Sequence, residues 1–289
     1  MLKALLKTMR PRQWTKNGFV FFALFFDKQL FVLESFLRTL EGFALFCLIS
    51  SVIYIINDIA DIESDRKHPE KRKRPLAAGK LPLHIAWIAA IGLTVIILPF
   101  GYLLSPAFAA VLLAYLLIQL AYSKWLKHLP IIDVLIIAAG FVLRVHSGIT
   151  LIEVERFSPW LYVVTTLGAL YLGLGKRRAE LNLLAQGAGA HRKVLDGYTI
   201  PLLDQYVTII SAATILAYSL YTFSAPNLPE NNSMMLTIPF VVYIIFRYLY
   251  LIQVTHSAGA PDEVLLTDTP IQLAIALFGI TVLVIFYLA

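Results

Sequence analysis

Residues 39–66 read TLEGFALFCLISSVIYIINDIADIESDR, an apolar run that passes directly into acidic and amide side chains. The apolar part, residues 39–56, has the length and composition of a helix that crosses a membrane. Four polar residues follow it at once, namely Asn57, Asp58, Asp61 and Asp65. Carboxylates are costly in hydrocarbon and rare at the ends of spans, so this cluster indicates a functional site at a membrane surface.

The three aspartates are spaced by three and four residues, so a helix would carry them on one face. Grouped oxygen ligands of this kind suit Mg²⁺, which binds through a few carboxylates together with substrate phosphates. We therefore predict that Asp58, Asp61 and Asp65 bind Mg²⁺. The expected chemistry acts on a phosphorylated substrate.

The composition indicates the class of protein. Hydrophobic residues make up 59% of the chain and charged residues 15%, which is outside the range of soluble globular domains. The sequence therefore predicts an all-α, polytopic membrane protein that forms one integral membrane domain over residues 1–289. Nine apolar runs approach the length of a membrane-spanning helix: 18–33, 39–56, 84–104, 106–122, 131–151, 159–175, 203–223, 235–252 and 270–288.

The distribution of charge orients these spans. Most of the 24 Lys and Arg residues fall in loops on one side, which also holds the N-terminus and the aspartate cluster. The positive-inside rule assigns that side to the cytoplasm. The net charge of +6 then reflects topology and phosphate binding, and we expect no nucleic-acid partner. Cys47 is the only cysteine, which excludes an internal disulfide.

The acidic motif continues into a basic loop that ends at Arg74-Pro75. The pattern Asn57-Asp58-x-x-Asp61-x-x-x-Asp65-Arg66, followed by Arg74-Pro75, resembles the first signature of the UbiA superfamily of intramembrane prenyltransferases. Residues 122–133 are similar to the segment that joins spans 4 and 5 in that family. The resemblance implies a bundle of about nine helices around a cytoplasm-facing polar cavity. In such a site the carboxylates hold Mg²⁺, and the metal holds a diphosphate leaving group.

The second signature of that family is altered in this chain. Where most members have further spaced aspartates, residues 175–182 read GKRRAELN. On a helix Glu180 would lie close to Lys176 and Arg177, so one interpretation is an ion pair at a helix end. The other is an anion site, because ammonium and guanidinium groups in place of carboxylates favour phosphate over a second metal. We favour the anion site.

This alteration resembles one branch of the superfamily, the decaprenyl-phosphate phosphoribosyltransferases, as do residues 10–17 and 192–198. The branch implies phosphoribosyl pyrophosphate as donor, a long polyprenyl phosphate as acceptor and Mg²⁺ as cofactor. It also implies a bacterial inner (plasma) membrane and the supply of lipid-linked arabinofuranose for cell-envelope glycans. One carboxylate cluster with added cations suits a reaction that gathers a diphosphate and two further phosphate groups.

The predicted catalytic set consists of the three aspartates, which hold the donor pyrophosphate through Mg²⁺, and Asn57, which orients it. The ionised phosphate of the acceptor attacks C1 of the ribose and inverts it. Positioning and electrostatics supply the catalysis. The predicted substrate-binding residues are Lys16, Asn17, Arg66, Lys73, Arg74, Tyr122, Lys127, Asp133, Lys176, Arg177 and Glu180.

The sequence leaves several alternatives open. Arg144 is either an intramembrane site residue or a cation that reaches the outer surface. An ordinary prenyltransferase for quinone or haem synthesis is the competing enzyme. A transporter or a non-catalytic lipid-binding protein is the competing class. Membrane lipid is an expected partner in every case, and a homo-oligomer is compatible with the sequence.

Overall fold

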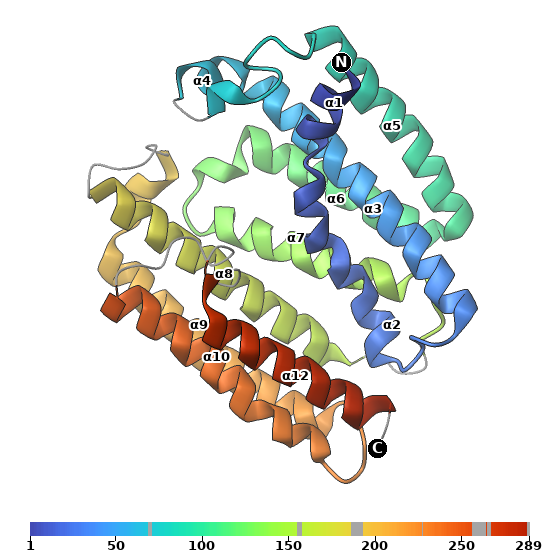
Figure 1. Cartoon of the computed structure of the whole chain (residues 1–289), viewed down its shortest axis with the longest axis vertical. Coiled ribbons are helices and arrows are strands. Elements are labelled where there is room, and N and C mark those ends of the chain that lie inside the picture. The colour runs from blue at the N-terminus through green and yellow to red at the C-terminus, as the bar shows by residue number, and fades with distance from the viewer. Residues whose placement is uncertain are drawn as a thin grey trace. The chain divides into compact units, whose positions relative to one another are not determined.

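The computed structural model describes residues 1–68, 71–154, 158–185, 193–226, 228–255, 264 and 267–287, and the regular structure within them is helical. The chain divides into two compact units (Figure 1). The N-terminal unit comprises residues 1–126 and 143–154, and the C-terminal unit comprises residues 127–142 and 155–289. Helix α7, Ile132–Ile149, contributes to both units, since the boundary falls within it. The predicted all-α class is confirmed.

The N-terminal unit is built on α3, the helix that leads into the acidic motif. Its elements are α1 (Leu2–Met9), η1 (Pro11–Phe21), α2 (Phe22–Phe26), α3 (Leu33–Ala60), α4 (Ile62–Lys67), η2 (Lys71–Lys73), α5 (Leu83–Leu104) and α6 (Pro106–Lys124). Phe46 and Ile49 of α3 are fully buried in the core of this unit. Ala86 and Ala90 of α5 lie in the same core, and such small side chains let two helices approach closely.

The segment before α3 corrects one predicted boundary. A span over residues 18–33 was expected, but helical backbone instead covers Pro11–Phe26 as η1 and α2. The helix ends there because polar residues follow. Lys28 has a φ of 58°, outside the helical region, and Gln29 donates to the carboxylate of Asp27 at 2.6 Å. Helix α3 then begins anew at Leu33.

The 3₁₀ geometry of η1 determines which of its residues face the core. With three residues per turn, Trp14, Asn17 and Val20 line up on one side. Trp14 donates from Nε1 to Oγ of Ser51 on α3 at 3.0 Å, and Asn17 and Val20 are buried. Gly148 of α7 lies against the carbonyl of Val20, and a Cβ at that position would overlap the carbonyl oxygen. Helix η1 is therefore packed against both α3 and the last turn of α7.

Among the described residues, the C-terminal unit contains the first part of α7 and seven elements that follow it. They are α8 (Pro159–Ala185), η4 (Lys193–Gly197), α9 (Ile200–Ser224), η5 (Ser233–Thr237), α10 (Ile238–Tyr250), the π-helical turn η6 (Leu251–Thr255) and α12 (Thr269–Tyr287). Leu174 of α8, Leu203 of α9, Ile245 of α10 and Ile271 of α12 meet in its buried core. This core packs the part of α8 that precedes Lys176 and Arg177 against its neighbours.

Seven helices in the described chain are long and apolar enough to cross a membrane. They cover Leu33–Ala60, Leu83–Leu104, Pro106–Lys124, Ile132–Ile149, Ile200–Ser224, Ser233–Val254 and Thr269–Tyr287. Helix α8 has 27 residues, but Thr, Gly, Lys and Arg residues lower its apolarity, and it is not one of the seven. The membrane class is therefore confirmed, whereas the predicted count of nine spans is not.

Candidate active site

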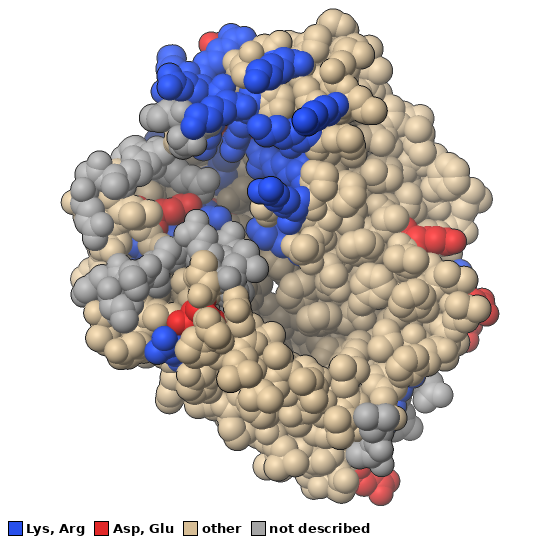
Figure 2. Space-filling model, viewed as in Figure 1, with Lys and Arg blue, Asp and Glu red and all other residues tan. Residues whose placement is uncertain are grey.

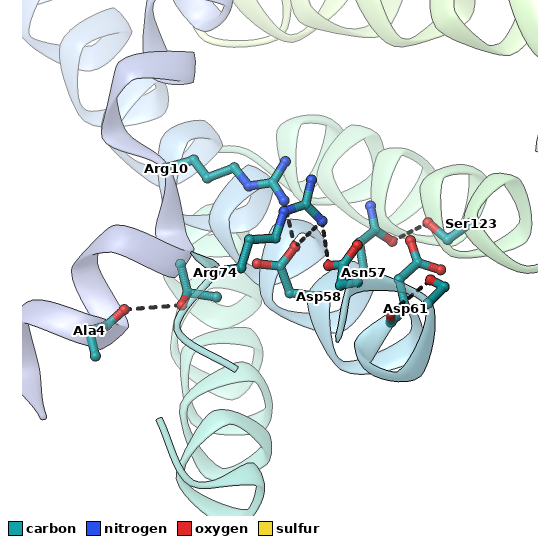
Figure 3. A network of polar contacts seen from close by, with 10 residues as sticks. Ala4, Arg10, Asn57, Asp58, Asp61, Arg74 and Ser123 are labelled. Carbon is teal, nitrogen blue, oxygen red and sulfur yellow. Dashed lines mark hydrogen bonds and ion pairs between the residues drawn. The ribbon is translucent and has the colours of Figure 1, made fainter. Parts of the chain in front are cut away.

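Two carboxylates, from α3 and α4, and two guanidinium groups form one cluster near the end of α3 (Figure 3). Asp58 and Asp65 are each only 2% exposed. Arg10 donates from Nη2 to Oδ1 of Asp58 at 2.5 Å. Arg74 donates from Nη1 to Oδ1 of Asp58 at 3.1 Å and to Oδ2 of Asp65 at 2.7 Å. Two buried carboxylate oxygens therefore converge on a single position, which is occupied by a cationic nitrogen.

Arg10 reaches Asp58 from a strained backbone. Its φ of 54° and ψ of 61° lie in the left-handed region, which costs a non-glycine residue about 1–2 kcal/mol. The guanidinium group also lies over the ring of Tyr54, 5.0 Å from its centroid. The ion pair and the ring contact offset the strain, and they fix the Arg10 side chain at the carboxylates.

Arg74 is placed by a tight loop between η2 and α5. Its carbonyl accepts the N–H of Ala78 at 2.8 Å. Gly79 has a φ of +70°, which glycine adopts without steric cost. Leu76 is buried in the core and anchors the loop. The loop thus presents Arg74 to both aspartates although it follows them by 9 and 16 residues.

The third aspartate lies at a break in the helix. Helix α3 ends at Ala60, and Asp61 has a φ of −96° and a ψ of 7° before α4 begins. The prediction that one helix face carries all three aspartates was wrong for this reason. Asp61 is partly exposed. Its neighbour Asn57 accepts a hydrogen bond at Oδ1 from the hydroxyl of Ser123 on α6, which fixes the amide (Figure 3).

The donor atoms fit Mg²⁺ at two of the three predicted ligands. Asp58 and Asp65 offer hard oxygen donors that already converge on one cation position. Mg²⁺ is commonly held by one or two carboxylates when substrate phosphates supply further oxygens. Among the described residues, no three His, Cys, Asp or Glu side chains lie close enough together to hold a metal by themselves. A metal-binding role for Asp61 stays a prediction.

Basic side chains surround this cluster. Figure 2 shows Lys and Arg gathered over the part of the N-terminal unit that holds α1 and α4. Of the predicted phosphate-binding residues, Lys73 is exposed in η2 and Lys16 is partly exposed in η1. Arg66 is exposed and pairs with Glu63 at 2.9 Å, and exposed pairs of this kind are weak and easily exchanged. A basic surface of this kind favours the approach of polyanions.

Asn17, another predicted substrate-binding residue, is committed to contacts inside the N-terminal unit. It is 1% exposed. Its Nδ2 donates to Sγ of Cys47 at 3.3 Å, and its Oδ1 accepts from Ser50 at 3.3 Å and from Nε of Arg144 at 2.8 Å. Arg144 also donates to the hydroxyl of Tyr115 at 2.7 Å and is 6% exposed. Arg144 is thus a cation buried within the N-terminal unit, and its guanidinium group is held by polar side chains of that unit.

In the C-terminal unit, Asp133 and Arg177 form a buried ion pair. Asp133 of α7 is 0% exposed, and its Oδ2 accepts from Nε of Arg177 at 2.6 Å. Arg177 of α8 is 2% exposed and donates from Nη1 to Glu180, one turn along α8, at 2.5 Å. The sequence suggested two roles for Arg177, one as the partner of Glu180 in an ion pair and the other as part of an anion site. The structure brings it to two carboxylates, and its binding of substrate phosphate stays a prediction.

Tyr198 completes this buried group. Its hydroxyl donates to Oδ1 of Asp133 at 2.7 Å and accepts the N–H of Ile131 at 2.6 Å. Burial, together with the hydrogen bond to Asp133, raises the pKa of Tyr198 above its ordinary value, so the phenol stays protonated. Ile131 has a φ of 69°, a strained conformation for a β-branched residue. Gly197 allows the close approach, because a Cβ there would overlap the ring of Pro130.

Three predicted residues remain, namely Lys176, Tyr122 and Lys127. Lys176 is partly exposed on α8. Tyr122 is partly buried on α6, and Lys127 lies in the short helical turn η3 (Leu126–His128). Their binding roles stay predictions.

Three residues of these clusters were missed as site residues in the sequence, namely Arg10, Ser123 and Tyr198. Arg10 and Tyr198 fall within the segments 10–17 and 192–198 that resemble the phosphoribosyltransferase branch, and Ser123 follows Tyr122 in a family segment. The sequence therefore contained a signal for these residues, since each lies in a segment that resembles the family. The sequence did not identify the partner of each side chain, because that partner comes from a distant segment.

The family model of the UbiA prenyltransferases matches residues 18–258 of the chain. The chain belongs to the UbiA prenyltransferase family. This confirms the resemblance drawn from the aspartate motif and places that motif in a UbiA fold.

Two relatives support the assignment to UbiA along almost the whole chain. The decaprenyl-phosphate phosphoribosyltransferase of Mycobacterium tuberculosis is 32% identical over 278 residues, which cover 94% of this chain and 91% of the relative. The enzyme of the same name from Corynebacterium glutamicum is 34% identical over 273 residues, which cover 93% and 82%. A UbiA homologue from Archaeoglobus fulgidus, solved with DMAPP and Mg²⁺, has a TM-score of 0.73 at 18% identity and covers 99% of both chains. This structural likeness shows the UbiA fold.

Proposed function

We propose that this UbiA protein transfers 5-phosphoribose from phosphoribosyl pyrophosphate to a polyprenyl phosphate, giving polyprenyl-phosphoryl-5-phosphoribose and diphosphate. The observation that carries the proposal is the paired carboxylate site at Asp58 and Asp65, enclosed by Arg10 and Arg74 and by a basic surface. Similarity to decaprenyl-phosphate phosphoribosyltransferases over 94% of the chain supports this choice among UbiA reactions.

Asp58 and Asp65 are the residues that would hold Mg²⁺, with Asp61 at the break of α3 as a third candidate. The metal, when bound with the donor, neutralises charge on the departing diphosphate. In the structure Arg74 forms ion pairs with both aspartates. Its guanidinium group, released from the carboxylates, matches the oxygens of a diphosphate in a two-point contact.

Further residues near the aspartates position and attract the substrates. Ser123 fixes the amide of Asn57, so that Asn57 presents its N–H₂ group in a defined direction. Arg10 supplies a second cation at Asp58, and the exposed lysines around α1 and α4 add long-range attraction for the donor. The acceptor phosphate is ionised near neutral pH. No strong general base is needed, and the chain contributes positioning and charge.

We further propose that the protein lies in a bacterial inner membrane with its N-terminus and site in the cytoplasm. The basic surface over α1 and α4 supports this orientation through the positive-inside rule. The product would supply lipid-linked arabinofuranose for cell-envelope glycans, a proposal that rests on the names of the relatives.

A paired assay tests the function. Purified protein in detergent with Mg²⁺ receives either labelled phosphoribosyl pyrophosphate with polyprenyl phosphate, or prenyl diphosphate with labelled 4-hydroxybenzoate. The proposal predicts label in the lipid phase only in the first mixture, and its loss in Asp58→Ala protein that remains folded. Product from the second mixture alone would establish an ordinary prenyltransferase. Product from neither mixture, with protein that is folded by circular dichroism, would favour the non-catalytic class.

A further inference from the structure

A line of hydrogen bonds in the C-terminal unit ends at the charged turn of α8. The N–H of Ile131 donates to Tyr198, Tyr198 donates to Asp133, and Arg177 donates to both Asp133 and Glu180. The side chains of Asp133 and Arg177 are 0% and 2% exposed, whereas that of Glu180 is 23% exposed. Glu180 is therefore the one charged member of this line that solvent or a substrate reaches.

A single cation serves both carboxylates of this group. Arg177 directs Nε at Asp133 and Nη1 at Glu180, so a single buried guanidinium group faces two carboxylates. Withdrawing such a cation to bind substrate would leave Asp133 as an uncompensated buried charge, which is strongly unfavourable. The geometry therefore assigns Arg177 to holding Glu180 in place.

Lys176 is affected by this arrangement. On a helix Lys176 and Glu180 lie four residues apart on one face and ordinarily pair. Here Glu180 is held by Arg177 at 2.5 Å, and no ion pair joins Lys176 to any acid among the described residues. Lys176 is partly exposed. The ion pair expected at this helix end thus exists, and its cation is Arg177. Lys176 is therefore left available to an external anion.

We propose that Arg177 is a positioning residue that withholds Glu180 from Lys176, and that Lys176 binds a phosphate monoester. This inference rests on the proposed function, in which two such groups occur, the acceptor phosphate and the 5-phosphate of the donor. Ammonium groups bind phosphate as compact point charges, which suits a monoester at a partly exposed position. Arg177 then holds the acid while Lys176 binds phosphate, which explains why this turn carries several cations and one acid.

The test measures binding separately from turnover. Isothermal titration in detergent gives the Kd of farnesyl phosphate and of phosphoribosyl pyrophosphate with Mg²⁺. Lys176→Gln is expected to weaken one of the two ligands about tenfold, and the ligand affected identifies the source of the phosphate. The double variant Asp133→Asn with Arg177→Gln removes both buried charges together and frees Glu180. It is expected to weaken the same ligand several-fold, and adding Glu180→Gln is expected to restore the affinity.

A neighbouring ion pair supplies the control. Arg178 of α8 pairs with Asp204 of α9 at 2.5 Å and is 8% exposed. The double variant Arg178→Gln with Asp204→Asn therefore removes an ion pair from the same helix while leaving Lys176 and Glu180 unchanged. We expect lower stability in this control and unchanged ligand Kd values.

Each outcome bears on the proposal. Wild-type affinity for both ligands in Lys176→Gln, which should fold because the residue is partly exposed, overturns the phosphate role. Failure of Glu180→Gln to restore affinity overturns the positioning role of Arg177. Loss of phosphate affinity in Lys176→Gln, with no ribose transfer by the wild type, supports this inference while the proposed function fails. Wild-type protein that binds neither ligand overturns both.

Discussion

The contrast between Asp58→Asn and Asp61→Asn separates the structural from the catalytic role of the acidic motif. Asp58 is 2% exposed and accepts from Arg10 and Arg74, whereas Asp61 is partly exposed at the break of α3. Both residues are predicted metal ligands, so both substitutions should abolish Mg²⁺-dependent transfer. Only the first should also lower the free energy of unfolding.

The size of that loss follows from the contacts of Asp58. Hydrogen bonds to charged groups contribute about 1.5–3 kcal/mol each, roughly twice as much as neutral ones. Asparagine keeps an acceptor oxygen, so the two bonds from Arg10 and Arg74 lose about half of their strength, or about 2 kcal/mol together. The two guanidinium groups are 31% and 29% exposed, so water compensates in part. The full cost of about 3–5 kcal/mol for breaking a buried pair is then not reached.

Unfolding by sodium dodecyl sulfate in mixed micelles measures this loss, and labelled ribose in the lipid phase measures transfer. Asp61→Asn should unfold within about 0.5 kcal/mol of the wild type, as expected for a partly exposed side chain. Unchanged stability in Asp58→Asn would refute the account of the ion-pair cluster. Full activity in Asp61→Asn would remove that residue from the metal site and leave the site to Asp58 and Asp65.

Three further predictions concern the metal, the packing and the effect of pH. Chelation with EDTA should abolish transfer, and excess Mg²⁺ should restore it; activity that persists under chelation contradicts metal dependence. Gly148→Ala should destabilise the protein by about 1–3 kcal/mol, because the added methyl group meets the rigid carbonyl of Val20. Gly168 has open space around it, so Gly168→Ala should be neutral or up to about 1 kcal/mol stabilising. Equal unfolding midpoints for the two variants would contradict this packing. The hydrogen bond from Arg247 lowers the pKa of Asp268 below 3.8. This pair therefore stabilises the fold above that value and loses its effect as pH falls through the lower folded pKa. The stability difference between wild type and Arg247→Gln at pH 7 should accordingly shrink below about pH 4.

The membrane helices were predictable because an apolar segment in lipid must adopt a structure that satisfies its backbone hydrogen bonds. Every backbone polar group must bond within its own helix, so an apolar run maps directly to a helix. The expected spans 84–104 and 106–122 accordingly match α5, Leu83–Leu104, and α6, Pro106–Lys124, within two residues. The run 18–33 failed this rule because Asp27, Lys28 and Gln29 interrupt it with polar contacts of their own.

The site was predictable in its composition but less so in its geometry. Spacing alone placed Asp58, Asp61 and Asp65 on one face, which assumes that the helix continues, and α3 ends before Asp61. Arg10 could not be assigned to Asp58 from spacing, since the pair spans 48 residues and depends on a left-handed backbone at Arg10. Asp133 and Arg177, 44 residues apart, posed the same difficulty. Long-range ion pairs carry no periodic signal, so only the three-dimensional structure reveals them.

The two charged clusters place their carboxylates differently around a guanidinium group, and this bears on the chemistry. In the N-terminal unit two carboxylates share one nitrogen of Arg74, an arrangement that a divalent cation satisfies equally well. In the C-terminal unit one guanidinium group, Arg177, engages both nearby carboxylates, Asp133 and Glu180. Asp133 meets Nε and Glu180 meets Nη1, so these two acids do not converge on one atom and are poor ligands for a second metal. A single acidic metal site with surplus cations suits a donor and an acceptor that both bring phosphate.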